Sequence, residues 1–397
     1  MSVLACNGGT PVIEPAEFKR VIWPPVDEET AELLKELYLS RKWSFNSEME
    51  QQFEREFAEY HDAEYGIFMA NGTVTLECSL LALGIKPGDE VIVPGLTWIA
   101  TAMAVAYVGA IPVFADIEND TLCLSPEAFE KAITPKTKAV IPVHLYAGMA
   151  DLDAIIDIAK KHNIAVLEDC AHMQGGKWRG RGVGSWGNIG SFSFQQSKTL
   201  SSGEGGICIT NDRELADRLY RAKHIGYSRF DAQGAALSGP PADLPCHNYR
   251  GLAFSALLLS QQLKQLPERI SRMNEFYNDL KVIETIPGIR LQAPGRQASP
   301  QGCYALEIIF DPEIWGTAAQ ASAALRAEGI PLSSGNYGPV YKNMLFNCQN
   351  FRNTGCPTAE FIGTQAVSLS HTCMEYKEMV PVIEKAFRKV YEFRKEI

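Results

Sequence analysis

Between about Tyr65 and Thr210, short runs of apolar residues alternate with segments of helical periodicity. Runs of this length are typical of strands buried on both faces, and the helical segments between them predict a mainly parallel sheet in an α/β architecture. The seven predicted strands are Tyr65–Ala70, Val91–Val93, Ile111–Phe114, Ala139–Val143, Ala165–Leu167, Gly190–Phe194 and Gly206–Thr210. Predicted connecting helices include Thr73–Leu83 and Leu152–His162. Ligands of such sheets bind at the carboxyl ends of the strands.

The flanking segments have a different pattern. Amphipathic spacing predicts helices on both sides of the sheet region, and a strand with two helices near the C-terminus. These elements are Asp27–Leu39, Glu48–Tyr60, a helix ending near Lys223, the long helix Ala253–Leu280, the strand Ala305–Phe310, and the helices Ala318–Glu328 and Met379–Phe393. The Gly/Pro-rich stretch Gly226–Pro245 is too irregular to assign and is typical of a long functional loop. A chain of 397 residues suits two domains, predicted at 1–265 and 266–397.

One apolar stretch needs a decision between a membrane helix and globular structure. No charged residue occurs from Val91 to Ala115, which is long enough for a membrane helix. Pro94, Gly95, Gly109 and Pro112 divide it, however. A strand, a turn, a buried helix and a second strand fit these breaks better. We therefore predict no membrane segment here.

Composition narrows the classes of function. Hydrophobic residues make up 46% of the chain and charged residues 21%, as in ordinary globular proteins. The formal net charge of −10 disfavours nucleic acid and anionic membranes as partners, because both require clustered lysine and arginine. The ten cysteines include no C-x-x-C pair, so neither a zinc site nor a dithiol motif is predicted. Reduced thiols favour a cytoplasmic location.

The first candidate for chemistry is the segment Asn71-Gly72-Thr73-Val74, at a predicted strand-to-helix junction. Small residues there allow backbone N–H groups at a helix N-terminus to approach a phosphate. Taken alone, the segment is more typical of an ordinary turn with a helix cap.

The second candidate is Asp169, within Glu168-Asp-Cys-Ala-His172 at the end of an apolar strand. A carboxylate in that place is unfavourable unless it is paired. A protonated pyridine nitrogen is a suitable partner, and a helix cap is the simpler alternative.

The third candidate is Lys198, in the segment Gly190-Ser-Phe-Ser-Phe-Gln-Gln-Ser-Lys198, which precedes the glycine-rich turn Gly203-Glu-Gly-Gly206. A lysine held close to a sheet loses solvation, which lowers its pKa and suits an amine that forms imines. An isolated lysine is otherwise a solvated surface charge.

These three segments, in this order, resemble the DegT/DnrJ/EryC1/StrS family of aminotransferases. The resemblance runs from about Gly8 to the C-terminus and includes Gly88–Pro94, Thr97-Trp98, Pro142–Tyr146 and Asn248-Tyr-Arg250. Within the family, Gln195–Lys198, Asp169–His172 and Pro339–Phe346 are most similar to glutamine-dependent aminotransferases of scyllo-inosose and 2-deoxy-scyllo-inosose. The resemblance implies fold type I of pyridoxal-phosphate enzymes, with a large domain carrying a mainly parallel seven-stranded sheet and a smaller α+β C-terminal domain.

The resemblance also implies a role for each cofactor-site residue. Lys198 would form a Schiff base with pyridoxal 5′-phosphate and move a proton, and Asp169 would pair with the pyridine nitrogen. Trp98 would stack on the cofactor ring, and His172 would face its 3-oxygen or ring. The phosphate would be held by the Gly72 turn, the N–H groups of Thr73 and Val74, the Ser193 hydroxyl, and Asn248 of a neighbouring subunit. The active sites would then be shared within a homodimer.

The implied reaction moves an amino group from glutamine or glutamate to a ketone on a cyclitol or sugar ring, as in aminoglycoside biosynthesis. Candidate substrate contacts are Tyr146, Tyr337, Tyr341 and His371. Two departures stand out: many relatives have Gln at the place of His172, and Trp43-Ser-Phe-Asn46 lacks an expected glycine. The second departure puts substrate contacts from that loop in doubt.

Several alternatives remain beside this hypothesis. The sugar 3-dehydratases of the family replace the Schiff-base lysine with His, so Lys198 disfavours that activity. An aromatizing synthase of the aminobenzoate type, whose members share the His at 172, and a nucleotide-keto-sugar aminotransferase stay open. A nicotinamide dehydrogenase is disfavoured because no G-x-G-x-x-G opens the sheet. A regulator that binds the cofactor without turnover is disfavoured by intact Lys198, Asp169 and His172, and no DNA-binding segment is visible.

Overall fold

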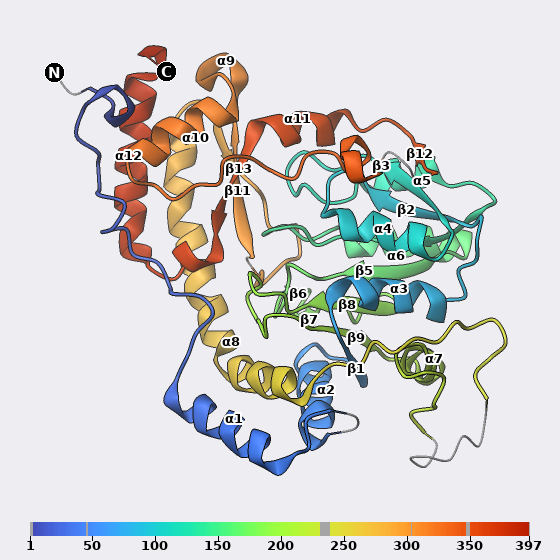
Figure 1. Cartoon of the computed structure of the whole chain (residues 1–397). Helices are drawn as coiled ribbons and strands as arrows, with labels where there is room; N and C mark the ends of the chain where they lie inside the picture. The colour runs from blue at the N-terminus through green and yellow to red at the C-terminus, as the bar shows by residue number, and fades with distance from the viewer. Residues whose placement is uncertain (1–2, 45–46, 231–238, 303, 347–349, 397) are drawn as a thin grey trace.

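The computed structural model describes residues 3–44, 47–230, 239–302, 304–346 and 350–396. Its centre is a twisted eight-stranded sheet, with order β1-β9-β8-β5-β4-β2-β3-β12 (Figure 1). The strands are β1 (Tyr65–Met69), β2 (Glu90–Pro94), β3 (Ile111–Ala115), β4 (Thr137–Val140), β5 (Ala165–Asp169), β8 (Ile189–Ser193), β9 (Gly206–Thr210) and β12 (Arg352–Asn353). Only the β1–β9 and β8–β9 pairs are antiparallel.

All seven predicted strands are present, with ends shifted by a few residues. The eighth strand, β12, was not predicted. It has two residues, comes from the C-terminal part of the chain and pairs with the edge strand β3. A two-residue strand is too short to produce an alternating pattern, so the sequence offers no sign of it.

The sheet is covered on both faces. In strand β1, successive side chains point to opposite faces of the sheet, and both faces are buried. Phe68 packs with one core cluster, while Ile67 and Met69 pack with the other. The first face carries α2 (Glu48–Tyr60) and the N-terminal part of α8 (Ala253–Leu280). The second carries α3 (Gly72–Ala82), α4 (Ile99–Tyr107) and α7 (Arg213–Lys223), whereas α6 (Leu152–His162) packs with α5 (Pro126–Ala132). Two covered faces explain why the central strands are apolar without alternation.

The apolar stretch Val91–Ala115 folds as β2, then α4, then β3, as its prolines and glycines predicted. α4 is nine residues long. Among the residues that the structure describes, no helix is long and apolar enough to cross a membrane.

The C-terminal part is a smaller α+β unit beside the main sheet. It holds an antiparallel three-stranded sheet of β10 (Ile289–Leu291), β11 (Ala305–Phe310) and β13 (Ala366–Ser370). Helices α10 (Ala318–Ala327), α11 (Pro357–Gln365) and α12 (Val380–Glu392) pack around it (Figure 1). The predicted boundary at 265/266 falls inside α8, whose 28 residues run unbroken past it. A helix therefore joins the two parts, and the division itself stays a prediction.

The remaining elements are short or lie at the N-terminus. Helix α1 is Glu28–Ser40, α5 is Pro126–Ala132, α9 is Pro312–Trp315, and β6 (Lys177–Trp178) pairs with β7 (Arg181–Gly182). The predicted loop Gly226–Pro245 includes 231–238, which lie outside the described residues, as do residues 45 and 46 of the segment Trp43–Asn46.

Candidate active site

A cavity of about 680 Å³ lies at the carboxyl ends of the central strands. The turn from β1 to α3, the start of α4, the ends of β5 and β8, and the C-terminal part of the chain all contribute to its wall. Predicted site residues that line it are Gly72, Thr73, Val74, Trp98, Asp169, His172, Ser193, Lys198 and Tyr337. The three segments singled out in the sequence thus meet at one place, as the rule for open α/β sheets predicts.

Lys198 lies on the wall of the cavity, after the end of β8. Burial lowers the pKa of its amine to about 8, and the negative charge of Asp169 opposes this shift without cancelling it. The ammonium lies 4.4 Å from the centre of the Tyr304 ring. An amine with a pKa near 8 is partly neutral under ordinary conditions, which nucleophilic attack on a carbonyl requires.

Asp169 is the last residue of β5 and is 4% exposed. Its Oδ2 accepts a hydrogen bond from the Thr101 hydroxyl at 2.8 Å, and its Oδ1 accepts one from the Ala171 N–H at 3.2 Å. Burial raises the pKa of the carboxyl, although these hydrogen bonds and the charge of Lys198 oppose the rise. Among the described residues, no cationic side chain lies within ion-pair distance of it. The carboxylate is therefore suited to a cationic ligand in the cavity.

His172 has a fixed tautomer. Its Nδ1 accepts a hydrogen bond from the backbone N–H of Tyr146 at 3.1 Å, so a proton on the neutral ring must be on Nε2. The ring stacks on Tyr304 with centroids 4.0 Å apart. Burial, and then the charge of Lys198, lower the pKa of His172, so the ring is neutral and offers one N–H donor.

The turn before α3 requires glycine at position 72. A Cβ atom there would lie 2.5 Å from the Ser193 Cβ and 2.9 Å from its Oγ, so no larger residue fits. The N–H groups of Thr73 and Val74 both donate to Oδ1 of Asn71 at 3.0 Å, which caps the helix. An anion at this end would share these donors with Asn71 or bind through the hydroxyl groups of Thr73 and Ser193.

The predicted substrate residues divide into two groups. Tyr337 lines the cavity and lies 5.3 Å from Trp98, measured between ring centroids. Tyr146 lies behind it: its ring stacks on Tyr337, and its hydroxyl donates to Oδ1 of Asn336 at 2.6 Å. Tyr146 is 2% exposed, so it supports the wall instead of forming its surface.

Tyr341 and His371 also lie off the cavity wall. The Tyr341 hydroxyl donates to Oε1 of Glu360 at 2.9 Å, and its ring packs against Phe114. His371 is 1% exposed, and its Nε2 bonds the backbone carbonyl of Ser197. For both residues, direct contact with the substrate stays a prediction. The sequence motifs of the family cannot show which of these side chains are turned away from the cavity.

Asn248 pairs with His224 in an isolated β-bridge and does not line the cavity of its own chain. Its predicted contact, with the cofactor phosphate of a neighbouring subunit, stays a prediction.

Two residues that line the cavity were not predicted from the sequence. Thr101 follows Trp98 by three residues, so one helical turn brings its hydroxyl to Asp169. Helical spacing from Trp98 could have suggested it. Tyr304 comes from the C-terminal part, stacks on His172 and bonds the Ser197 hydroxyl at 3.1 Å. Nothing near Tyr304 in the sequence marks it.

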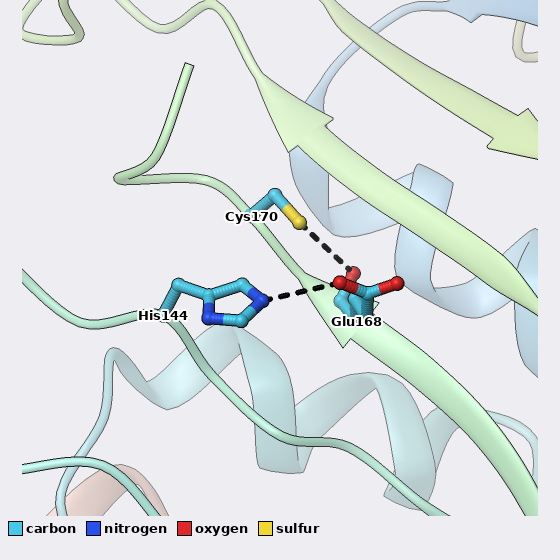
Figure 2. Close-up of side chains that lie close together, drawn as sticks. All are labelled: His144, Glu168 and Cys170. Carbon is cyan, nitrogen blue, oxygen red and sulfur yellow. Dashed lines mark hydrogen bonds and ion pairs between the residues drawn. The ribbon is translucent and has the colours of Figure 1, made fainter. Parts of the chain in front are cut away.

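On either side of Asp169 in the chain, Glu168 and Cys170 form a buried cluster with His144 that has metal-ligand chemistry (Figure 2). The Ala150 N–H donates to Nδ1 of His144, so Nε2 carries the proton and donates to Glu168 at 3.2 Å. Three backbone N–H groups, at residues 184, 186 and 187, also donate to the Glu168 carboxylate. The carboxylate is thus fully engaged by hydrogen bonds, and the cluster anchors the end of β5.

Comparisons with known proteins agree with this geometry. The model of the DegT/DnrJ/EryC1/StrS aminotransferase family matches residues 24–386. The L-glutamine:2-deoxy-scyllo-inosose aminotransferase of Streptoalloteichus tenebrarius is 38% identical over 355 residues, covering 86% of this chain and 83% of that protein. The solved 3-amino-5-hydroxybenzoic acid synthase superimposes with a TM-score of 0.86 at 28% identity, covering 96% of this chain and all of that one. DesV of S. venezuelae, solved with a ketimine intermediate, gives 0.80 at 29% identity, covering 93% and 95%.

Proposed function

The chain belongs to the DegT/DnrJ/EryC1/StrS aminotransferase family, and from that premise we propose that it transfers an amino group from glutamine or glutamate to a ketone on a cyclitol ring. One observation carries the proposal. Lys198, an amine with a pKa lowered to about 8, shares a cavity with the buried carboxylate of Asp169, which has no cationic partner at ion-pair distance among the described residues. An imine-forming amine and an acceptor for a ring cation are what amino-group transfer on a carbonyl cofactor requires.

The residues present fit pyridoxal 5′-phosphate. At the Gly72 turn, a Cβ atom would close the space beside Ser193, and the hydroxyl groups of Thr73 and Ser193 reach this end of the cavity. Asp169 lacks a cationic partner at ion-pair distance within the described part of the chain and suits a pyridinium nitrogen. When bound, the cofactor supplies an electron sink for the carbanion formed at the substrate carbon.

The remaining roles follow from the geometry of the chain. Lys198 would hold the cofactor covalently and, once released, carry a proton to and from the substrate carbon. His172 would donate from Nε2 to an oxygen on the ligand, because its Nδ1 is already used. Trp98 is 55% exposed at the cavity wall, which leaves its indole face open for stacking. Asn248 of a second subunit would complete the phosphate site, in a cytoplasmic homodimer.

The ketone is the least constrained part of the proposal. The relative from Streptoalloteichus is named for 2-deoxy-scyllo-inosose and glutamine, and we infer the same substrate class for this chain, as a step in aminoglycoside-type biosynthesis. The structural similarity to 3-amino-5-hydroxybenzoic acid synthase favours a second candidate. That candidate is an aromatizing synthase, which uses the same lysine to eliminate water from an amino-cyclohexenone. A nucleotide-linked keto-sugar as the acceptor is the remaining alternative.

Two measurements test the proposal. The purified protein should be yellow, and borohydride should attach the cofactor irreversibly to Lys198, as read by peptide mass spectrometry. Glutamine alone should then bleach the yellow form in a half-reaction, and a keto-inositol should restore it. A colourless protein unaffected by added cofactor would refute the cofactor assignment. Bleaching only by an already aminated cyclic compound would favour the synthase.

A further inference from the structure

The backbone around Lys198 is held by side chains from distant parts of the chain. Three carbonyl groups in residues 196–199 each accept a hydrogen bond from a different side chain. The pairs are Trp23 Nε1 with Gln196 O at 2.8 Å, His371 Nε2 with Ser197 O at 3.0 Å, and Arg269 Nη1 with Thr199 O at 2.8 Å. The donors come from the segment before α1, from the residue after β13, and from α8. This short segment therefore ties the N-terminal and C-terminal parts of the chain together.

The three donors also contact one another. The guanidinium of Arg269 lies 4.3 Å from the centre of the Trp23 ring, and the Trp23 ring meets His371 edge-on with centroids 4.9 Å apart. Arg269 is fixed in turn by Glu375, whose Oε1 accepts from its Nε at 2.8 Å. The N-terminal segment runs down the molecule toward α1 and reaches α8 through Trp23 (Figure 1). The contacts form one connected unit, which is difficult to loosen at a single point.

His371 is a donor in this unit by necessity. A backbone carbonyl only accepts, so Nε2 must carry the proton. The other nitrogen, Nδ1, is buried and has no hydrogen-bond partner in the described part of the chain. Burial and the charge of Arg269 lower the pKa of His371 to about 4. The ring is therefore neutral near pH 7, with its single N–H directed at Ser197.

We propose that Trp23, Arg269 and His371 are positioning residues: by fixing the carbonyl groups of residues 196–199 they set where Nζ of Lys198 lies in the cavity. The inference rests on the proposed function of Lys198. It gives His371 a role other than substrate contact and makes the N-terminal segment part of the active-site framework. The reason is steric and entropic: a lysine on a loose loop samples many positions, and a displacement of about 1 Å can cost about 100-fold in rate.

Substitutions can separate positioning from folding. Trp23→Phe keeps a ring between Arg269 and His371 but removes the donor to Gln196. His371→Leu removes the donor to Ser197, whereas His371→Gln keeps an N–H that can replace it. In the glutamine half-reaction of the holoenzyme, we expect the limiting rate to fall about 10-fold in Trp23→Phe and His371→Leu. The glutamine concentration for half-maximal rate should stay within about twofold. His371→Gln should recover most of the rate.

A matched control is available in Trp315. Its indole also donates to one backbone carbonyl, that of Pro287 at 2.9 Å, but it packs on Phe310 and Phe387, outside the cavity wall. Trp315→Phe should lower the melting temperature and leave the limiting rate per folded molecule unchanged. If Trp23→Phe and His371→Leu behave in the same way, the positioning role is wrong and the contacts only stabilise the fold.

A second readout does not depend on activity. Amide hydrogen exchange of the peptide that covers residues 195–202 should be several times faster in Trp23→Phe and His371→Leu, and unchanged in Trp315→Phe. Unchanged exchange in all three variants would overturn the inference. If the wild-type protein shows no lysine-linked yellow form, the proposed function fails, and the exchange data alone decide whether these side chains hold the loop.

Discussion

Two lysines in this molecule are withdrawn from water, and their surroundings push their pKa values in opposite directions. Lys198 lies on the cavity wall, and burial lowers its pKa to about 8. Lys223, at the end of α7, is 1% exposed, yet its pKa is raised. Burial opposes the charged form in both cases. The difference lies in the partners.

Lys223 is surrounded by acceptors. Its Nζ lies 2.7 Å from Oε1 of Glu50, 3.1 Å from Oε1 of Glu54 and 2.7 Å from the carbonyl oxygen of Phe68. These partners outweigh desolvation and keep the ammonium charged. Among the described residues, the more distant charge of Asp169 is the one that opposes the effect of desolvation on the pKa of Lys198. The comparison shows that burial alone does not create a reactive amine. The amine must also lack close carboxylate and carbonyl partners that would keep it charged.

Lys198→Ala gives the largest expected effect. Amino-group transfer should fall on the order of 10⁴-fold, because the group proposed to hold the cofactor and move the proton is lost. The free energy of unfolding of the cofactor-free protein should not decrease, since no close anionic partner loses its counter-charge. Turnover assays and denaturant titrations measure the two quantities. A variant that unfolds but keeps its activity per folded molecule would reverse the assignment.

Lys223→Met should produce the opposite result. Removing the ammonium leaves Glu50 and Glu54 buried without their main partner, so we expect a loss of about 3–5 kcal/mol in the free energy of unfolding. Turnover per folded molecule should change little. Lys264→Met, on the exposed side of α8, is the control and should cost less than about 0.5 kcal/mol. Equal stability of the two variants would show that the buried ion pairs do not stabilise the fold.

Chemical labelling can compare the two amines within one molecule. In cofactor-free protein, an amine-specific reagent should modify Lys198 increasingly as the pH rises through about 8, since only the neutral amine reacts. Below pH 8 the rate should fall about tenfold per pH unit. Lys223 should stay unmodified over this range, because its pKa is raised and it is buried. Peptide mass spectrometry reads both sites.

The same shift has a consequence for stability. The pKa of Lys198 in the folded chain, about 8, lies below the value of about 10.4 for an unfolded lysine. Between these two values the unfolded chain binds more protons, so this group makes folding more favourable as the pH rises. Lys223 contributes with the opposite sign, because its folded pKa is raised. Labelling that starts only above pH 10 at Lys198 would show that its amine is not desolvated in solution.

The sequence predicted the first of these lysines far better than the second. Lys198 lies between a strand end and a glycine-rich turn, within a sequence motif of the family. All three features are visible in the local sequence. Lys223 ends an ordinary amphipathic helix, and its partners are about 170 residues earlier, on α2. Periodicity places α2 and α7 correctly, but it cannot show that two glutamates of one helix reach a lysine of another. That pairing depends on how the helices cross the sheet.

Prediction of the cavity from the sequence meets the same limit. Its strand-end residues were predictable because carboxyl ends of parallel strands meet at one edge. The orientation of Tyr146, Tyr341 and His371 was not, since each side chain bonds a partner in another segment of the chain. Tyr304 reaches the cavity from the C-terminal part through tertiary packing alone.

The smallest expected effect concerns the partner of Lys198. Thr101→Val removes the hydroxyl that donates to Oδ2 of Asp169 at 2.8 Å while keeping the shape of the side chain. That bond favours the ionised carboxyl, so its loss should raise the already elevated pKa of Asp169 further. Activity that depends on ionised Asp169 should then decline at a higher pH on the acid side, with roughly a fivefold lower rate at pH 7.

Thr97→Val is the matched control, because the Thr97 hydroxyl lies 3.0 Å from that of Thr101, and its pairing with Asp169 is indirect. It should shift the acid side of the pH–rate profile less than Thr101→Val does. Equal shifts would mean that the two hydroxyls act as one chain on the carboxylate. No shift in either variant would mean that Asp169 is held ionised by its ligand alone. In that case the contrast with Lys223, whose own side-chain partners fix its charge, would be sharper still.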